Sequence, residues 1–409
     1  MTSRERVLKA LNFERPDRLP IELGAMRASG IASPVYAALK RRLGIDSPTK
    51  VIDAMQILAE VEPAVQDALH LDVVPLDVTT AGWQLADTAG GVLKKPFPDT
   101  EVFFPPGTNI AVAPNGDWLL LDAADRPYAR MPAGGFYFDF LRPTMAGQID
   151  PDAFRPAADV PDEQLQDISD LARHFDENTD KAVLGWGAAL SLVGLSALLA
   201  ENITQGSLDA WLTMLLTEKP AAHEMMGRYV DSAIKRLELY SQAVGDRCVA
   251  WGVGSDDAGT QRGELISPEL FAEMIKPHYK RLCDWIHAHT PWKTYLHSCG
   301  CVRGYIEHWI DAGVDILNPV QISAAEMEPE SLMEEFGGRI VFWGGGCDTQ
   351  KVLPLGSPEQ VREHVRHNIS VFGSGSGGFV FTQVHNIQPN VPVENVEAML
   401  QAAYDYGAC

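Results

Sequence analysis

The chain has 409 residues, of which 46% are hydrophobic and 22% are charged, as in an ordinary globular protein. Its 55 acidic residues outnumber its 33 basic ones, and the formal net charge of −22 argues against nucleic acid and anionic membrane surfaces as partners. The first residues lack the apolar stretch of a secretory signal, and no run of about 18 apolar residues is free of charge or glycine. We therefore expect a cytoplasmic protein whose six cysteines are reduced.

Short apolar segments that indicate strands alternate with amphipathic segments along nearly the whole chain. Several of the strand segments are apolar on both faces, which is typical of a parallel sheet covered by helices. Eight strand–helix units predict an α/β fold, a (β/α)₈ TIM barrel. The predicted strands are residues 19–23, 72–76, 182–186, 248–253, 293–297, 314–318, 340–343 and 379–382.

The predicted helices lie between these strands. Two of them begin with a proline at the first helical position, after Ser267 and after Ser357, which is a good start signal. The helices are predicted at residues 34–43, 51–69, 207–244, 267–289, 301–312, 329–336 and 357–372.

Residues 83–140 interrupt this alternation, because they are rich in glycine, proline and aromatic residues. Turn signals at Gly90-Gly91 and Asn115-Gly116 predict β-hairpins there. We expect a β-rich insertion after the second strand, near the active-site mouth. Its aromatic run at 136–138 would either close over a substrate or form the insertion's own small core. No linker or internal repeat is evident, which predicts a single domain over residues 1–409.

Polar and metal-binding residue types follow most of the predicted strands. Functional side chains of a barrel enzyme lie at the carboxyl ends of its strands, so these residues are expected to converge at one mouth. Arg27 follows the first strand and Asp77 the second. The fourth to eighth strands are followed by Asp256, Asp257 and Gln261, by His297 and Cys299, by Asn318 and Gln321, by Cys347 and Asp348, and by His385.

The charged residues at these strand ends each allow two interpretations. Asp256 and Asp257 would act as a base, a substrate anchor or a further metal ligand, or one of them would cap a helix. Asp77 would face the mouth or cap its own turn, and Arg27 would meet a substrate carboxylate or pair with an acidic neighbour. These four are the candidate catalytic residues. The candidate substrate-binding residues are Gln261, Asn318, Gln321 and Asp348.

His297 and Cys299 form the most specific local signal. Side chains alternate along a strand, so residues two apart at a strand end point to the same side. Imidazole and thiolate are ligands that suit zinc. Cys347, His385 or both would complete such a site, with an open position for substrate if it is catalytic. The alternative is that the cysteines are small buried thiols and that His297 is a hydrogen-bonded core histidine.

Four segments carry a family resemblance. The chain begins with Arg4-Glu-Arg-Val-Leu-Lys-Ala-Leu-Asn-Phe-Glu-Arg-Pro-Asp-Arg-Leu-Pro, and Met26-Arg-Ala-Ser-Gly is similar to the motif Met-Arg-Gln-Ala-Gly-Arg-Tyr. Over essentially its whole length the chain resembles the uroporphyrinogen decarboxylase superfamily. Asp77 stands where the decarboxylases carry a catalytic aspartate, and His385 stands where they carry a histidine. The second arginine of the motif is missing and is replaced by Ile31 or Ala32.

The resemblance implies a (β/α)₈ barrel and two alternative chemistries. Decarboxylases of the superfamily use no metal and bind a polycarboxylate tetrapyrrole, for which so acidic a chain is poorly suited. Corrinoid-dependent methyltransferases hold zinc with a His-x-Cys…Cys motif, and His297-Ser-Cys299 matches its first half. His385 replaces the last cysteine, and Cys347 is a substitute from the neighbouring strand. The segments around Cys347 and His385 resemble the subgroup linked to O-demethylation.

These observations lead to three hypotheses. The first is a zinc-dependent methyltransferase that moves a methyl group between a small methoxy, methylated or thiol substrate and a corrinoid (cobalamin). Because the chain has no Asp-x-His-x-x-Gly motif, the corrinoid would be carried by a separate corrinoid protein. The second is a metal-free decarboxylase that uses Asp77 and Arg27. The third is a non-catalytic barrel that binds a corrinoid or tetrapyrrole, and a homodimer is left open as the assembly.

Overall fold

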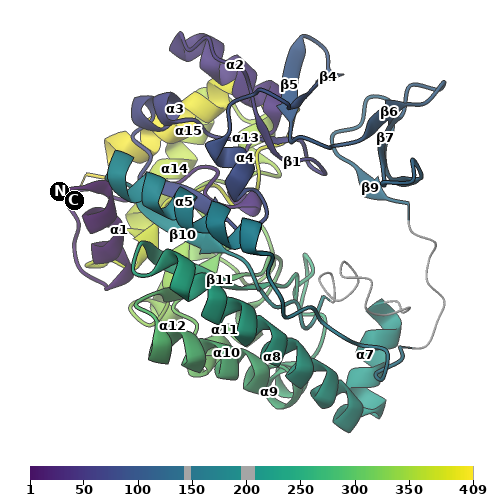
Figure 1. The fold of residues 1–409 in the computed structure, drawn as a ribbon. Helices are drawn as coiled ribbons and strands as arrows, with labels where there is room; N and C mark the ends of the chain where they lie inside the picture. Colours follow the sequence, from purple (N-terminus) through teal and green to yellow (C-terminus); the bar gives the residue numbers. More distant parts are fainter. Residues whose placement is uncertain (142–148, 195–207, 409) are drawn as a thin grey trace.

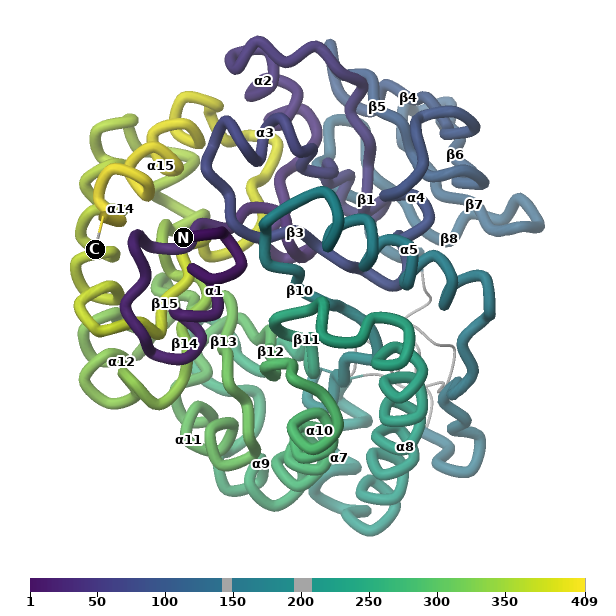
Figure 2. Tube along the Cα trace, turned by 60° about the vertical axis from the view of Figure 1, so that its left-hand side comes forward, coloured from purple at the N-terminus to yellow at the C-terminus, as the bar shows by residue number. Residues whose placement is uncertain are grey.

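The computed structural model describes residues 1–141, 149–194 and 208–408. Seven parallel strands form its central sheet, in the order β15-β14-β13-β12-β11-β10-β3. Helices surround these strands (Figure 2). The seven coincide with the second to eighth strands predicted from the sequence. They are β3 (Val73–Asp77), β10 (Ala182–Trp186), β11 (Cys248–Ser255), β12 (Lys293–His297), β13 (Ile316–Asn318), β14 (Val341–Trp343) and β15 (Phe379–Val380).

The segment predicted as the first strand closes this sheet into a barrel. Ile21 forms a parallel bridge with Phe381, next to β15. On that side the Glu22 amide donates to Phe381 O at 2.8 Å, and on the other side the Asp72 amide donates to Ile21 O at 2.8 Å. The segment is thus bonded to both edges of the sheet, although it is too short to count as a full strand. The predicted α/β barrel is confirmed.

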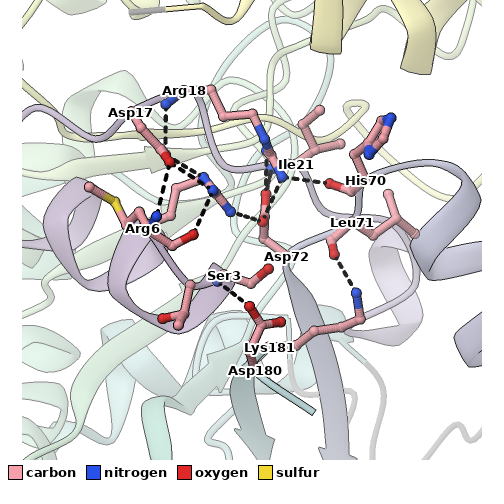
Figure 3. Close-up of polar contacts among 12 residues, drawn as sticks. Ser3, Arg6, Asp17, Arg18, Ile21, His70, Leu71, Asp72, Asp180 and Lys181 are labelled. Carbon is pink, nitrogen blue, oxygen red and sulfur yellow. Dashed lines mark hydrogen bonds and ion pairs between the residues drawn. The ribbon is translucent and has the colours of Figure 1, made fainter.

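The Asp72 side chain fixes this closure at the amino-terminal end of the barrel (Figure 3). Its carboxylate is fully buried and accepts bonds from the Ile21 amide at 2.9 Å and from Arg6 Nη1 and Arg18 Nη1, each at 2.7 Å. Arg6 also pairs with Asp17 at 2.7 Å. Burying a carboxylate is tolerated only where its charge is paired and its oxygens are bonded, and both conditions are met here.

The helices largely follow the predicted intervals. The predicted helices over 207–244 and 267–289 are each divided in two, and Ser207 lies outside the described residues. Helices α1, α4, α5, α13 and α15 were not predicted. The helices are α1 (Ser3–Leu11), α2 (Ser33–Leu43), α3 (Pro63–Ala68), α4 (Ala81–Leu85), α5 (Asp162–Asn178), α7 (Leu208–Thr217), α8 (Lys219–Val244), α9 (Pro268–Met274), α10 (Lys276–His289), α11 (Arg303–Ala312), α12 (Pro329–Phe336), α13 (Val352–Leu355), α14 (Pro358–Phe372) and α15 (Val393–Tyr406), with a short 3₁₀ helix at Arg27–Ser29.

The helix predicted over 51–69 is wrong in its first half. Strands β1 (Val51–Asp53) and β2 (Leu58–Ala59) form a hairpin there, and α3 follows at Pro63. Asp53 Oδ1 accepts a bond from the Gln56 amide at 2.8 Å, which turns the chain. Ile57 then adopts a φ of 52°, a left-handed conformation that ends any helical continuation.

Inward-facing side chains fill the barrel and alternate along each strand, as the pleat requires. Tyr295 of β12, Val341 and Trp343 of β14 belong to this interior cluster. Val7, Ala10 and Leu11 of α1 join the same cluster, so α1 closes the amino-terminal end. The mouth is therefore left to the carboxyl ends of the strands.

The predicted β-rich insertion is present after β3. It consists of one two-stranded sheet and one four-stranded antiparallel sheet, and it projects beside the barrel on the side away from the two termini (Figure 1). Phe138 is 3% exposed in the insertion's own cluster, whereas Phe136 and Tyr137 are 41% and 47% exposed. The strands are β4 (Val92–Phe97), β5 (Thr100–Phe104), β6 (Ile110–Val112), β7 (Trp118–Leu121), β8 (Pro127–Met131) and β9 (Asp139–Phe140).

The β1–β2 hairpin connects the insertion to the barrel. Val51 and Ile57 of the hairpin share the apolar cluster of the insertion with Phe138. The Phe138 amide also donates to Met55 O at 2.7 Å, and the Ser33 amide donates to Ile57 O at 3.0 Å. The hairpin is thus held by the insertion on one side and by the start of α2 on the other. No described helix has the length and apolar character needed to cross a membrane.

Candidate metal centre at the barrel mouth

Strand alternation places two polar side chains side by side above the filled interior. Tyr295 points into the barrel, so His297, two residues further along β12, does so as well. On the neighbouring strand β13, Asn318 pairs with His297 in the sheet register. Both side chains are nearly fully buried, His297 at 3% and Asn318 at 1% exposure. The last residues of these two strands therefore form part of the floor of the mouth.

Asp257, His297 and Cys299 form a compact group at this mouth. The Cys299 thiol donates to Asp257 Oδ1 at 3.2 Å, and His297 Nε2 lies 3.7 Å from the same oxygen. One donor atom from each of the three residues lies within 4.8 Å of the other two. In the part of the chain that the structure describes, this group alone brings three such side chains so close. The Asp257 side chain is 68% exposed, so the group opens to solvent on one side.

Hydrogen bonds fix the tautomer of His297. Asn318 Nδ2 donates to Trp343 O at 2.8 Å, which leaves Asn318 Oδ1 as an acceptor. His297 Nδ1 lies 2.6 Å from that oxygen and must therefore carry the proton. The Nε2 atom keeps its lone pair and faces Asp257. Burial lowers the pKa of His297, which favours this neutral form.

His385 stands beside His297 with its ring in an edge-on orientation. The two ring centroids are 5.8 Å apart and the ring planes meet at 68°. His385 Nδ1 lies 2.9 Å from Asn386 Oδ1, in the same arrangement of imidazole and asparagine that holds His297. His385 is thus a neighbour of the three-residue group, outside the 4.8 Å limit that defines it.

Cys347 lies apart from the group. Its side chain is fully buried among the apolar residues of the large cluster that packs the helices onto the sheet. Its thiol makes only a long contact of 4.0 Å with Asp348 O. Burial raises the pKa of this thiol, so it is protonated in its present surroundings. These surroundings favour the interpretation of Cys347 as a small buried thiol over its interpretation as a zinc ligand.

Asp256 and Asp257 differ although they are adjacent. Asp256 is 1% exposed, and its carboxylate accepts bonds from the amides of Leu192 and Val193, each at 2.8 Å, and from that of Gly194 at 2.6 Å. The Tyr279 hydroxyl donates a further bond at 3.1 Å. The Ser191 hydroxyl donates a fifth bond at 3.4 Å. With five donors, Asp256 holds the chain that follows β10 and has little capacity left for a substrate.

Arg27 and Asp77 meet at the edge of a cavity next to the group. Arg27 Nε donates to Asp77 Oδ2 at 3.1 Å, and Arg27 Nη2 donates to Thr79 Oγ1 at 2.7 Å. The nearby Asp77 carboxylate raises the pKa of Arg27. Arg27 and Asp77 line a cavity of about 330 Å³ together with Ser255, which pairs with His297 in the sheet. The cavity thus reaches the strand position beside the candidate metal centre.

The predicted substrate-binding residues take different positions. Gln321 is 5% exposed, and its Oε1 accepts a bond from the Gly300 amide at 2.8 Å. Its Nε2 atom is buried without a hydrogen-bond partner among the described residues. Asp348 accepts from the Gln350 amide at 2.7 Å and shapes its own turn, while the Gln261 side chain is exposed. Of the predicted set, Gln321 and Asn318 lie directly beside the ligand candidates.

These features can be compared with known proteins. A profile described as Uroporphyrinogen decarboxylase (URO-D) matches residues 140–406, which is more than half of the chain. The chain belongs to the uroporphyrinogen decarboxylase family. The family resemblance seen in the sequence is therefore confirmed.

Two relatives of this family member are informative. Uroporphyrinogen decarboxylase from Schizosaccharomyces pombe is 24% identical over 201 residues, which are 46% of this chain and 53% of that protein. The chain thus matches about half the length of this curated relative. A solved methyltransferase from Methanosarcina mazei is 15% identical with a TM-score of 0.59, and the alignment covers 99% of each chain. At that identity the likeness shows a shared fold.

The mouth of this uroporphyrinogen decarboxylase family member fits a zinc ion. Imidazole nitrogen, thiolate sulfur and carboxylate oxygen are the zinc ligands of proteins, and three of them leave a fourth position open. A hydrogen bond to the far nitrogen of a ligating histidine is the usual second layer of such sites, and Asn318 provides it. Gln321 Nε2, next to the group, is buried without a hydrogen-bond partner among the described residues, and a water or another polar molecule at the mouth would satisfy it.

The sequence did not single out Gln56 and Asn386. Asn386 follows His385 directly, and Gln56 lies in the β1–β2 hairpin that was predicted as a helix. The signal for Asn386 was present in the Val384-His-Asn run, since an asparagine beside a histidine can fix its tautomer. Gln56 had no local signal, because its contact joins residues that are 330 positions apart.

Proposed function

We propose that the protein is a zinc-dependent methyltransferase that acts with a separate corrinoid protein. The observation that carries the proposal is the group formed by Asp257, His297 and Cys299 at the barrel mouth. A zinc ion held there would act as a Lewis acid on the ether, alcohol or thiol heteroatom of a small substrate. The shared fold with a protein described as a methyltransferase supports the same chemistry.

The chain's own residues prepare this site. Burial and the nearby Asp257 raise the pKa of the Cys299 thiol, so the thiol holds its proton until a cation arrives. Asp257 Oδ1 accepts the thiol hydrogen bond and is exposed, which gives the proton a path to solvent. His297 contributes a neutral imidazole, and Gln321 Nε2 offers a donor for a polar substrate atom. The adjoining cavity of about 330 Å³ has room for a small organic substrate.

Metal analysis and one pair of variants test the proposal. Protein purified without a metal-binding tag should hold nearly one zinc per chain, and it should methylate free cob(I)alamin from at least one donor in a panel of small methoxy and methylthio compounds. Cys299→Ser should lose both zinc and transfer. Cys301→Ser is the matched control, because Cys301 is a buried thiol two residues away and outside the group. A zinc content below about 0.1 per chain would exclude the proposal.

A second candidate function is metal-free decarboxylation of an acidic aromatic or pyrrole compound. The Arg27–Asp77 contact at the cavity favours it, as does the family to which the chain belongs. This function predicts CO₂ release by metal-free protein and its loss in Asp77→Asn. The methyltransferase proposal predicts no CO₂ release, with or without zinc.

A further inference from the structure

Two asparagines hold the two histidines of the mouth, and they differ in what holds them. Asn318 is oriented by a main-chain oxygen, that of Trp343. Asn386 donates through Nδ2 to the side-chain oxygen of Gln56, which belongs to the turn of the β1–β2 hairpin. The orientation of Asn386 therefore depends on a side chain that a single substitution can remove.

The hydrogen bonds around Asn386 occupy both ends of its amide. Nδ2 donates to Gln56 Oε1, and Gln388 Nε2 donates to Asn386 Oδ1 at 2.6 Å. Asn386 Oδ1 is therefore an acceptor, and His385 Nδ1 at 2.9 Å must be the protonated nitrogen. The lone pair of His385 is left on Nε2, as it is in His297. An amide turned the other way would present hydrogens to Nδ1 and would move the lone pair there.

Gln56 itself is held from the insertion side. Its amide donates to Asp53 Oδ1 at 2.8 Å, and the next residue, Ile57, is fully buried in the cluster that contains Phe138. The Phe138 amide donates to Met55 O, the residue before Gln56. The core of the insertion and the turn that carries Gln56 thus pack as one unit.

We propose that Gln56 is a positioning residue that sets the Nδ1–H tautomer of His385 through Asn386. Fixing this tautomer keeps Nε2 of His385 available as a lone-pair donor beside the Asp257, His297 and Cys299 group. Through the β1–β2 hairpin, the insertion thereby supports the ligand chemistry of a histidine that is distant from it in sequence. The tautomer assignment stands on the hydrogen bonds alone, whereas its consequence for zinc rests on the proposed function.

Nitrogen NMR of the metal-free protein tests the assignment directly. In protein labelled with ¹⁵N-histidine, the His385 resonances are identified by their loss in His385→Gln. The wild-type protein should show a protonated Nδ1 and an unprotonated Nε2 at His385. Gln56→Leu should shift these resonances toward a mixture of tautomers, whereas Gln56→Glu keeps an acceptor for Asn386 Nδ2 and should leave them unchanged. Gln84→Leu is the matched control, since Gln84 is bonded to Pro75 O instead.

A rescue experiment separates positioning from packing. A carboxylate has only acceptor oxygens, so Asn386→Asp forces the Nδ1–H tautomer whatever stands at position 56. The Gln56→Leu/Asn386→Asp protein should regain the wild-type His385 resonances. Unchanged resonances in Gln56→Leu, or failure of the rescue, would overturn the inference. If Gln56→Leu does not fold, Gln56→Lys decides it, because a lysine can only donate and would require Asn386 to turn its oxygen toward position 56 and its hydrogens toward His385 Nδ1. An unchanged His385 tautomer in Gln56→Lys would overturn the inference.

Zinc affinity links the inference to function through a separate measurement. Should His385 complete the zinc site as its fourth ligand, Gln56→Leu should lower zinc affinity about 10–100-fold, as loss of a hydrogen bond that orients a ligating histidine does, and Asn386→Asp should reverse the fall. A wild-type protein that binds no zinc would refute the proposed function and leave the NMR result to decide the tautomer. Zinc binding that is tight and equal in wild type and Gln56→Leu would refute the role of Gln56 in metal binding.

Discussion

The two ends of the barrel hold carboxylates in opposite surroundings. At the amino-terminal end, Asp72 is fully buried and its oxygens accept bonds from Arg6, Arg18 and the Ile21 amide. At the carboxyl end, Asp257 is exposed, and it contacts a thiol that can exchange its proton for a metal and a neutral imidazole whose Nε2 lone pair can bind one. The difference teaches that satisfied polar groups stabilise this barrel, whereas partly satisfied ones mark the place for a ligand.

The largest effect should come from the amino-terminal end. Asp72→Ala leaves two arginines facing a buried space without their partner and frees the Ile21 amide. Removing one member of a buried ion pair costs about 3–5 kcal/mol, so we expect a loss of that size in the free energy of unfolding measured with urea. A loss below about 1 kcal/mol would show that the network contributes little to closing the barrel.

Asp257→Ala should give the reverse result. Its exposed side chain contributes little to stability, so the free energy of unfolding should change by no more than about 0.5 kcal/mol. Zinc affinity should fall at least about 100-fold, more than for a residue that only orients a ligand. The zinc affinities of the two proteins can be measured by competition with a chelating dye. An unfolding change as large as that of Asp72→Ala would remove the distinction between the two ends.

Asn318 tests the metal centre separately from the ligands, because it orients His297 without binding the metal itself. Asn318→Leu removes the acceptor for His297 Nδ1 and should lower zinc affinity about 10–100-fold. Asn318→Asp keeps an acceptor at the same place and is the matched control. If both variants bind zinc equally well, the orientation of His297 is set by packing instead.

The dependence of zinc binding on pH tests the protonation states of the two buried ligand candidates, with the smallest change expected for each step of one pH unit. The pKa of Cys299 is raised, so the thiol is protonated near neutral pH and must release one proton when it binds a metal. The pKa of His297 is lowered, so the imidazole is already neutral and releases none. Zinc affinity should therefore rise about tenfold per pH unit between about pH 6 and 8. A slope near two protons would contradict a neutral His297.

Much of the fold follows from local patterns in the sequence. Short apolar runs marked seven strands of the sheet, and His297 and Asn318 were named because each ends a predicted strand, which is where the structure has them. The apolar run at 19–23 predicted the first strand as well. In the structure this segment makes only one bridge, and the Asp72 carboxylate with its two arginines holds it in place of a full ladder of backbone bonds. These features depend on neighbours in sequence or on a repeating period.

Other features depend on contacts that no local pattern reveals. Cys347 could not be placed from β14, because Gly344 and Gly345 have φ values of 127° and 75° and break the alternation that begins at Trp343. The separate roles of Asp256 and Asp257 are decided by the loop after β10 and by Tyr279, which approach only one of them. The hairpin at 51–59 owes its shape to an insertion that follows it in the chain.

The single bridge at Ile21 has a consequence for the order in which the strands of this barrel can assemble. Its partner Phe381 lies 360 positions further along the chain, so this seam cannot form until both segments have been synthesised. Contacts between segments so distant in sequence are among the slowest to form. Asp72, whose side chain bonds the Ile21 amide, would hold the amino-terminal segment beside β3 while the other strands are added. The same carboxylate that stabilises the finished barrel would then keep its first strand in register during folding.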